Sequence, residues 1–205
     1  IIGQSTLCLI FTSGTTGLPK AAKVTHARWL GTGEAWCDFL GLGPTDAFYC
    51  VLPLYHVAAL MSLLANALAS GGRVILKRRF SASQFWQDVR RHDITVAQYS
   101  GEMCRYLFNQ PPHPDDKNHS LRVMTGSGLS PAIWQAFQDR FGVTQMIEGY
   151  GGTELNVGMM NIDMSGPRAA PFASTVMARV QMLTVAHRSL PRPKYAGRVI
   201  ALPGG

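Results

Sequence analysis

Short apolar runs alternate with longer segments of helical character along most of the chain. Apolar runs that end in turn residues predict strands at residues 7–11, 21–25, 48–52, 73–76, 95–99, 121–125 and 144–147. The run at 7–11 is typical of a buried strand. Helices are expected at residues 26–42, 57–69, 81–92, 102–109 and 131–141. Because strands and helices alternate, the pattern predicts an α/β fold with a mostly parallel sheet that helices flank on both faces.

One segment of this pattern has a competing interpretation. Residues 47–72 carry no formal charge, which is long enough for a membrane span. However, Pro53 interrupts the segment, and His56 and Asn66 would need polar partners in lipid. A strand–turn–helix unit of a buried α/β core is therefore favoured. A membrane span and a peripheral membrane contact remain as alternatives.

Composition supports a folded body and limits its setting. The 205 residues are 46% hydrophobic and 15% charged, which is enough apolar material for a packed core and argues against intrinsic disorder. None of the four cysteines forms a C-x-x-C pair, so neither a zinc site nor a disulfide scaffold is indicated. Reduced cysteines fit a cytoplasmic protein. The chain starts at Ile1 without a signal-peptide pattern, and we expect it to be a fragment.

The basic charge belongs to the end of the chain. Residues 1–164 contain 13 Lys and Arg against 12 Asp and Glu, whereas residues 165–205 contain six basic residues and no acid. Basic residues interleaved with aromatic ones are missing, so no nucleic acid partner is expected. We therefore divide the chain into a body, 1–164, and a basic tail, 165–205. The proline-containing tail fits a disordered segment, a membrane-surface segment, or sequence read in another frame.

The richest chemical signal lies between the first two expected strands. It is a run of hydroxyl and glycine residues that ends in Pro-Lys: Thr12, Ser13, Gly14, Thr15, Thr16, Gly17, Leu18, Pro19 and Lys20. Glycines allow backbone N–H groups to curl around an anion, the hydroxyls add donors, and lysine adds a mobile positive charge. This combination suits a polyphosphate. The spacing is not that of an ordinary P-loop, because Pro19 stands where that motif has glycine.

Two further motifs follow later strands, where ligands of open α/β sheets bind. The first consists of Tyr150, Gly151, Gly152, Thr153 and Glu154. Its tyrosine could stack on a base, its threonine could donate to a phosphate oxygen, and its glutamate could hold Mg²⁺. The second consists of Gly126, Ser127 and Gly128, whose small side chains allow a flat ring to approach the backbone. Plain glycine-rich connections are the alternative for both.

Together these motifs resemble the adenylate-forming (AMP-binding) superfamily. The run at 12–20 is similar to its phosphate-loop signature, and residues 150–154 are similar to its Y-G-x-T-E motif. Further segments are similar to the branch of fatty-acid-transport proteins and very-long-chain acyl-CoA synthetases: residues 52–56, 80–86, 101–107 and 128–134. The resemblance covers residues 7–163. It implies part of the large N-terminal domain of such an enzyme, without the C-terminal domain.

The resemblance also implies a reaction and a set of roles. A fatty acid carboxylate attacks the α-phosphorus of ATP, and the thiol of coenzyme A then displaces AMP to form a thioester. Residues 12–17 and Lys20 would hold the β- and γ-phosphates, and Tyr150 with residues 126–128 would enclose adenine. Thr153 would contact the α-phosphate and Glu154 would bind Mg²⁺, so Lys20, Thr153 and Glu154 are the expected catalytic residues. The expected substrate-site residues are His56 and Gly101, although a histidine bonded to the backbone at a helix start is nearly as well supported for His56.

The chain departs from this family after residue 164. Asp163 is the last acid, so the family's ribose-binding aspartate is missing, and Lys194 lies in no version of its lysine motif. A change of frame or splicing near residues 164–167 and a genuinely divergent tail are the two explanations. We therefore expect this chain alone to be inactive. An adenylate-forming ligase for another acid and an inactive nucleotide- or lipid-binding remnant remain alternatives; a cytoplasmic location with peripheral membrane association is compatible with each, and oligomeric state is not indicated.

Overall fold

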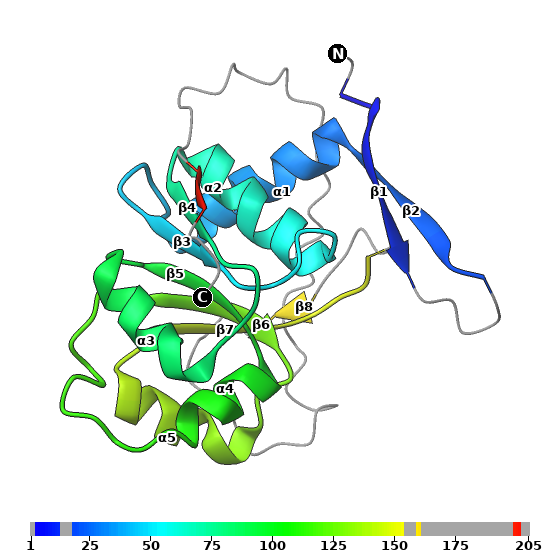
Figure 1. Cartoon of the computed structure of the whole chain (residues 1–205). Coiled ribbons are helices and arrows are strands. Elements are labelled where there is room, and N and C mark those ends of the chain that lie inside the picture. Colours follow the sequence, from blue (N-terminus) through cyan, green and yellow to red (C-terminus); the bar gives the residue numbers. More distant parts are fainter. Residues whose placement is uncertain (1–2, 13–17, 154–158, 161–198, 202–205) are drawn as a thin grey trace.

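A central parallel sheet organises the molecule, as the computed structural model in Figure 1 shows. The structure describes residues 3–12, 18–153, 159–160 and 199–201. Within these residues, one sheet has the strand order β8-β7-β6-β5-β3-β4-β9. Its strands are β3 (Ala47–Cys50), β4 (Arg73–Leu76), β5 (Val96–Ser100), β6 (Val123–Ser127), β7 (Gln145–Tyr150), β8 (Met159–Met160) and β9 (Val199–Ala201). Neighbours are parallel except for β7 and β8.

Helices cover both faces of this sheet (Figure 1). One face carries α1 (His26–Leu40), the π-helix η1 (Ala58–Leu64) and α2 (Ala65–Ser70). The other carries α3 (Ala82–Arg91), α4 (Gly101–Phe108) and α5 (Pro131–Phe141). Side chains of β3 and β7 alternate between the two layers: Phe48 and Ile147 pack with the first layer, whereas Tyr49 and Met146 pack with the second. The predicted α/β fold with a parallel sheet is confirmed.

Local signals explain where the helices begin and end. The Ser100 hydroxyl accepts a hydrogen bond from the Met103 N–H at the start of α4, and the Ser130 hydroxyl accepts one from Ala132 at the start of α5. Helices α1 and α5 end at Gly41 and Gly142, whose φ angles are +60° and +71°. Glycine adopts this left-handed conformation without the steric cost of a Cβ, so these helices stop at glycine.

The first two strands form where the sequence predicted them, but the first is not buried. β1 (Thr6–Thr12) and β2 (Lys20–Thr25) form a separate antiparallel hairpin that projects beside the main sheet (Figure 1). The expected strand at 7–11 is therefore not a buried strand of the parallel sheet. Only its Ile10 is buried, whereas Leu9 is 50% and Phe11 is 69% exposed. Ile10 joins Val24 of β2 in a cluster against α1 and η1.

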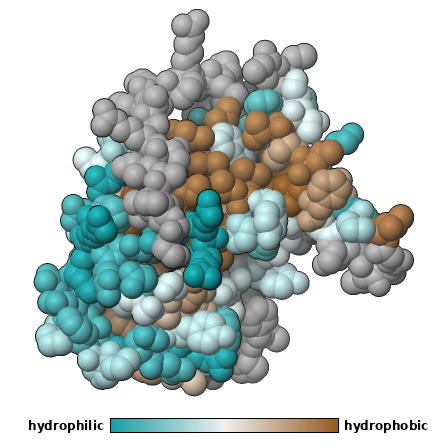
Figure 2. Space-filling model, in the orientation of Figure 1, coloured by the Kyte–Doolittle hydropathy of each residue, from teal (hydrophilic) through white to brown (hydrophobic). Residues whose placement is uncertain are grey.

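The uncharged segment 47–72 folds as β3, η1 and α2 in the core. Among the described residues, no helix has the length and apolar character needed to cross a bilayer. Figure 2 shows hydrophobic surface gathered over the α1–η1–α2 layer, while the α3–α5 layer presents mostly hydrophilic side chains. The membrane-spanning interpretation of the segment is therefore wrong, and its apolar residues are accounted for largely by packing.

Candidate nucleotide site

The predicted glycine motif and the tyrosine motif meet at one edge of the sheet. β5, β6 and β7 are neighbouring parallel strands, with Ser100 opposite Ser127 and Gly126 opposite Glu148. Parallel strands end at the same edge, about 4.8 Å apart. Gly101 begins α4 directly after β5, and Tyr150 ends β7. The structure thus brings Gly101, Gly126, Ser127, Gly128 and Tyr150 to one place.

Glycine is required at two of these positions by close backbone contacts. A Cβ built on Gly101 would lie 1.6 Å from the Gly128 carbonyl oxygen. A Cβ on Gly126 would lie 2.1 Å from the Tyr99 carbonyl oxygen and 2.7 Å from its ring. Both contacts are far inside van der Waals separation, so no larger residue fits. The ends of β5 and β6 are therefore packed backbone against backbone.

Glu148 of β7 organises this edge, and the sequence analysis missed it. Its carboxylate accepts hydrogen bonds from the Gly128 N–H, from the Leu129 N–H at 3.3 Å and from the Tyr99 hydroxyl at 2.7 Å. Burial and this carboxylate raise the pKa of Tyr99 far above its usual range. An acid on the same strand face as Met146 and Tyr150, beside the apolar Ile147, was the signal that could have revealed it.

The tyrosine motif is open to solvent at its start and held to α1 at its end. Tyr150 is 60% exposed, and Gly151 is exposed beside it. The Thr153 carbonyl accepts a hydrogen bond from the Arg28 guanidinium in the first turn of α1, at 3.0 Å. Arg28 is a second residue that the sequence analysis missed. Glu154, the expected Mg²⁺ ligand, lies outside the described residues, and its role stays a prediction.

The phosphate-loop motif spans the outer end of the hairpin. Thr12 and Lys20 are paired there, and the Thr12 hydroxyl donates to the Lys20 carbonyl at 3.5 Å. Lys20 is exposed, while Ser13, Gly14, Thr15, Thr16 and Gly17 lie outside the described residues. Arg28, which binds Thr153, lies beyond the opposite end of β2. β2 separates Lys20 from Thr25, the residue before α1, by about 17 Å.

His56 occupies an exposed turn before η1. Its Nδ1 accepts a hydrogen bond from the Ala58 N–H at 3.2 Å, and its own N–H donates to the Pro53 carbonyl at 2.9 Å. This is the backbone-bonded arrangement that the sequence analysis kept as an alternative. A substrate contact for His56 stays a prediction.

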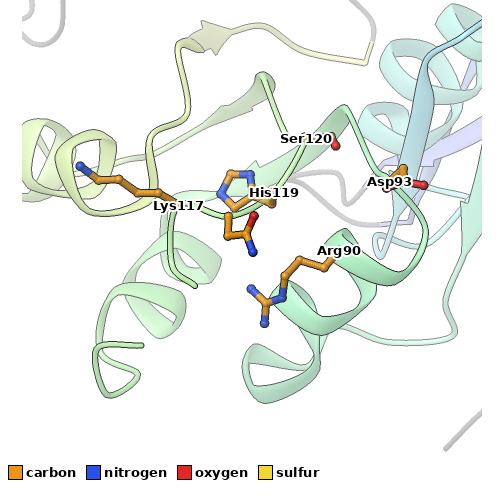
Figure 3. Close-up of a pocket in the computed structure, with 6 residues that line it drawn as sticks. Arg90, Asp93, Lys117, His119 and Ser120 are labelled. Carbon is orange, nitrogen blue, oxygen red and sulfur yellow. The ribbon is translucent and has the colours of Figure 1, made fainter. Parts of the chain in front are cut away.

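A hollow at the opposite edge of the sheet is lined by charged side chains that do not converge on one point. It has a volume of about 470 Å³ and is lined by Arg90, Asp93, Lys117, Asn118, His119 and Ser120. Figure 3 shows Lys117 pointing away from Arg90. The Arg90 guanidinium already donates to the Asp115 carbonyl at 3.2 Å. Nor do the described residues contain a cluster of three His, Cys, Asp or Glu that could hold a metal. The strand edge with Tyr150 therefore remains the candidate site.

A family model that covers most of the sequence identifies the class of enzyme to which the chain belongs. Residues 3–192 match the family model described as AMP-binding enzyme. The chain belongs to this family. The match continues past residue 164, where we expected the resemblance to end; the boundary between body and tail stays a prediction.

Within this family, the curated relatives similar to this chain have names that refer to fatty acids. The chain is 46% identical to long-chain fatty acid transport protein 3 of Homo sapiens over 164 residues, which cover 80% of the chain and 24% of that protein. It is 43% identical to the medium/long-chain-fatty-acid–CoA ligase FadD6 of Mycobacterium tuberculosis over 182 residues, 87% of the chain and 30% of that protein. The chain thus matches about a quarter of the length of such relatives.

Solved structures agree on the fold. The chain resembles o-succinylbenzoate coenzyme A synthetase (MenE) from Bacillus subtilis, in complex with ATP and magnesium ion. The TM-score is 0.67 at 26% identity, over 80% of this chain and 34% of that one. The described part of the chain is therefore a portion of the larger domain of an adenylate-forming enzyme.

Proposed function

We propose that the protein containing this segment activates a long-chain fatty acid with ATP and Mg²⁺ and passes the acyl group to coenzyme A. The observation that carries the proposal is the convergence of Gly101, residues 126–128 and Tyr150 at one sheet edge. Relatives that are about 45% identical and named for long-chain fatty acids support the substrate class.

The residues present at this edge fit a nucleotide. The Tyr150 ring is exposed, and the neighbouring loop at 126–128 carries no bulky side chain, which leaves a flat surface for a purine. Thr153 follows with a hydroxyl that would donate to the α-phosphate. Bound Mg²⁺, with Glu154 as its proposed ligand, would neutralise phosphate charge. Such chemistry depends on positioning and electrostatics rather than on a protein nucleophile.

Lys20 and the hydroxyls of the hairpin loop would hold the departing phosphates. For Lys20 and Thr153 to act on one nucleotide, the outer end of the hairpin and residues 150–153 must both reach its phosphates. The fatty acid carboxylate would then meet the α-phosphorus between the two motifs. Coenzyme A would enter after pyrophosphate leaves, because its thiol attacks the acyl group in the second step.

The test uses a chimaera in which the matched segment of this chain replaces its counterpart in FadD6. We expect exchange of pyrophosphate into ATP that depends on a long-chain fatty acid. Lys20→Ala should lower the exchange rate by about a hundredfold or more, since it removes charge stabilisation, while Lys23→Ala on the same strand serves as the matched control. Equal rates in the two lysine variants would contradict the role of Lys20.

The same chimaera distinguishes two alternative functions: a ligase for another carboxylic acid, and a remnant that does not catalyse the reaction. Pyrophosphate exchange supported by short, aryl or amino acids but not by long-chain fatty acids would show that the substrate belongs to another class of acid. A folded chimaera that binds ATP without any exchange would support an inactive nucleotide-binding remnant. Thermal unfolding and ATP binding, measured beside the exchange assay, separate this result from a chimaera that does not fold.

We also propose a peripheral contact with a membrane surface on the side of the hairpin. Leu9, Phe11 and Leu18 are 50%, 69% and 88% exposed, and Lys20 and Lys23 are exposed on the same hairpin. Apolar side chains flanked by lysines suit an anionic lipid surface. The full chain should sediment with vesicles that contain phosphatidylserine, and Phe11→Ser should reduce this fraction. Sedimentation that Phe11→Ser leaves unchanged would refute the contact.

A further inference from the structure

Glu148 is the one acid among the described residues at the candidate nucleotide site. Its two carboxylate oxygens accept three hydrogen bonds from groups on two other strands or the loops after them. Two of the donors are the consecutive N–H groups of Gly128 and Leu129, directly after β6. The third is the Tyr99 hydroxyl from β5, which also lies 3.2 Å from the Ile147 carbonyl.

These bonds restrain the backbone where β6 ends: Gly126 and Ser127 still pair with β5, whereas Gly128 and Leu129 lie beyond the strand and donate to Glu148. Among residues 126–128 only Ser127 has a side chain, and it is exposed. Gly128 has a φ of +81°, a conformation that glycine adopts freely and leaves freely. A carboxylate that accepts from two adjacent N–H groups restrains both peptide planes at once, and charge-assisted bonds are about twice as strong as neutral ones.

We propose that Glu148 is a positioning residue for the purine nucleotide. It holds the backbone of residues 126–128 so that this segment and Tyr150, two residues further along β7, can both face the purine ring. This inference rests on the proposed function. Glu148 and Tyr150 point to the same face of β7, because side chains two apart in a strand share a face. The loop and the tyrosine are thereby set in register by one strand.

Tyr99 completes the arrangement and offers a second handle. Its ring lies against Gly126, where a Cβ would be 2.7 Å from ring atoms, and its hydroxyl reaches Glu148 at 2.7 Å. Tyr99 is 3% exposed, so its hydroxyl is shielded from competing water. Removing this hydroxyl should loosen Glu148 without emptying the space that the ring fills.

The experiment compares Glu148→Gln and Tyr99→Phe with Glu34→Gln, a control acid on the exposed side of α1. Glutamine keeps the size of glutamate but offers one acceptor oxygen, so an amide NH₂ would face an N–H or the tyrosine hydroxyl. In the full chain, hydrogen exchange of peptides covering residues 126–130 should be about tenfold faster in Glu148→Gln, with β3 unchanged. Tyr99→Phe should give a smaller acceleration, and Glu34→Gln none.

In the chimaera, Glu148→Gln should raise the KM for ATP about tenfold and leave the KM for the fatty acid within about twofold. Hydrogen exchange at residues 126–130 that is unchanged in Glu148→Gln would overturn the inference. So would faster exchange with a normal KM for ATP, or a parallel rise of both KM values with a lower Tm, which is the result of a merely structural role. Lack of pyrophosphate exchange in the unmodified chimaera would instead contradict the proposed function, while the hydrogen-exchange comparison still decides whether Glu148 holds the loop.

Discussion

Replacing Gly101 with alanine tests whether the contact between the ends of β5 and β6 sets the nucleotide site. The added Cβ would lie 1.6 Å from the Gly128 carbonyl oxygen, 2.2 Å from its carbon and 2.8 Å from the Leu129 nitrogen. Ordinary contact begins at 3.4 Å, so α4 and the 126–128 loop must separate by about 1.8 Å. All three atoms belong to backbone, and no flexible side chain can move aside.

We expect two separate effects of this displacement. Overpacking of this kind costs about 1–3 kcal/mol of the free energy of unfolding. A displacement of more than 1 Å at a substrate-positioning loop costs about a hundredfold in rate. The first is measured by urea denaturation, and the second by kcat/KM for ATP in pyrophosphate exchange by the chimaera.

Gly43→Ala is the matched control, because a Cβ there has no heavy atom within 4 Å. Gly43 lies in the turn between α1 and β3, far from the site in the fold. Its alanine variant should match the unmodified protein in both measurements. If Gly101→Ala retains kcat/KM within about twofold of Gly43→Ala, the backbone contact does not position the nucleotide.

Three further outcomes follow from buried groups away from this edge. Asp46 binds Arg122 at 2.9 Å and the Thr95 hydroxyl at 2.6 Å, so Asp46→Ala should cost about 3 kcal/mol in urea denaturation; a loss below about 1 kcal/mol would contradict the importance of this network. Burial lowers the pKa of His119 below 6.5, so the unfolded chain binds more protons near pH 6 and stability should fall between pH 7.5 and 5.5; His119→Phe should flatten this fall, and an identical pH profile would refute the assignment. Burial raises the pKa of Cys37 and of Cys50 to about 11, so iodoacetamide at pH 7.5 should modify the folded chain at least about tenfold more slowly than the chain in urea, as mass spectrometry of the two peptides would reveal.

Most elements of the main sheet were predictable because their signals are local. The strand expected at 73–76 and the helix expected at 131–141 match β4 and α5 in their bounds. Two glycines precede β4 and a run of charged residues follows it, while Ser130 and Gly142 flank α5. Both strands of the hairpin were predicted, but the first was wrongly expected to be buried because Leu9 and Phe11 are as apolar as core residues. Apolar character alone does not distinguish a buried strand from a strand with an exposed face.

The site was only partly predictable because its key contacts join distant segments. Glycines at 101 and 126 signal a special backbone, but the atoms they approach belong to Gly128 and Tyr99, on the neighbouring strand or the loop that follows it. Glu148 was missed because its partners are two N–H groups about twenty residues earlier and one hydroxyl almost fifty residues earlier. Such pairings depend on strand order, which a single sequence does not reveal.

The hairpin acts geometrically as a lever. Its base is fixed where Val24 packs with Trp29 and Met61, and the Trp29 indole N–H donates to the Leu60 carbonyl at 2.9 Å. Its outer end, at Thr12 and Lys20, lies about 13 Å from Val24 along β2. A tilt of about 10° at the base therefore moves Lys20 by about 2 Å, most of the length of one hydrogen bond. Small changes of side-chain volume at the base would thus shift the position of Lys20 without touching Lys20 itself.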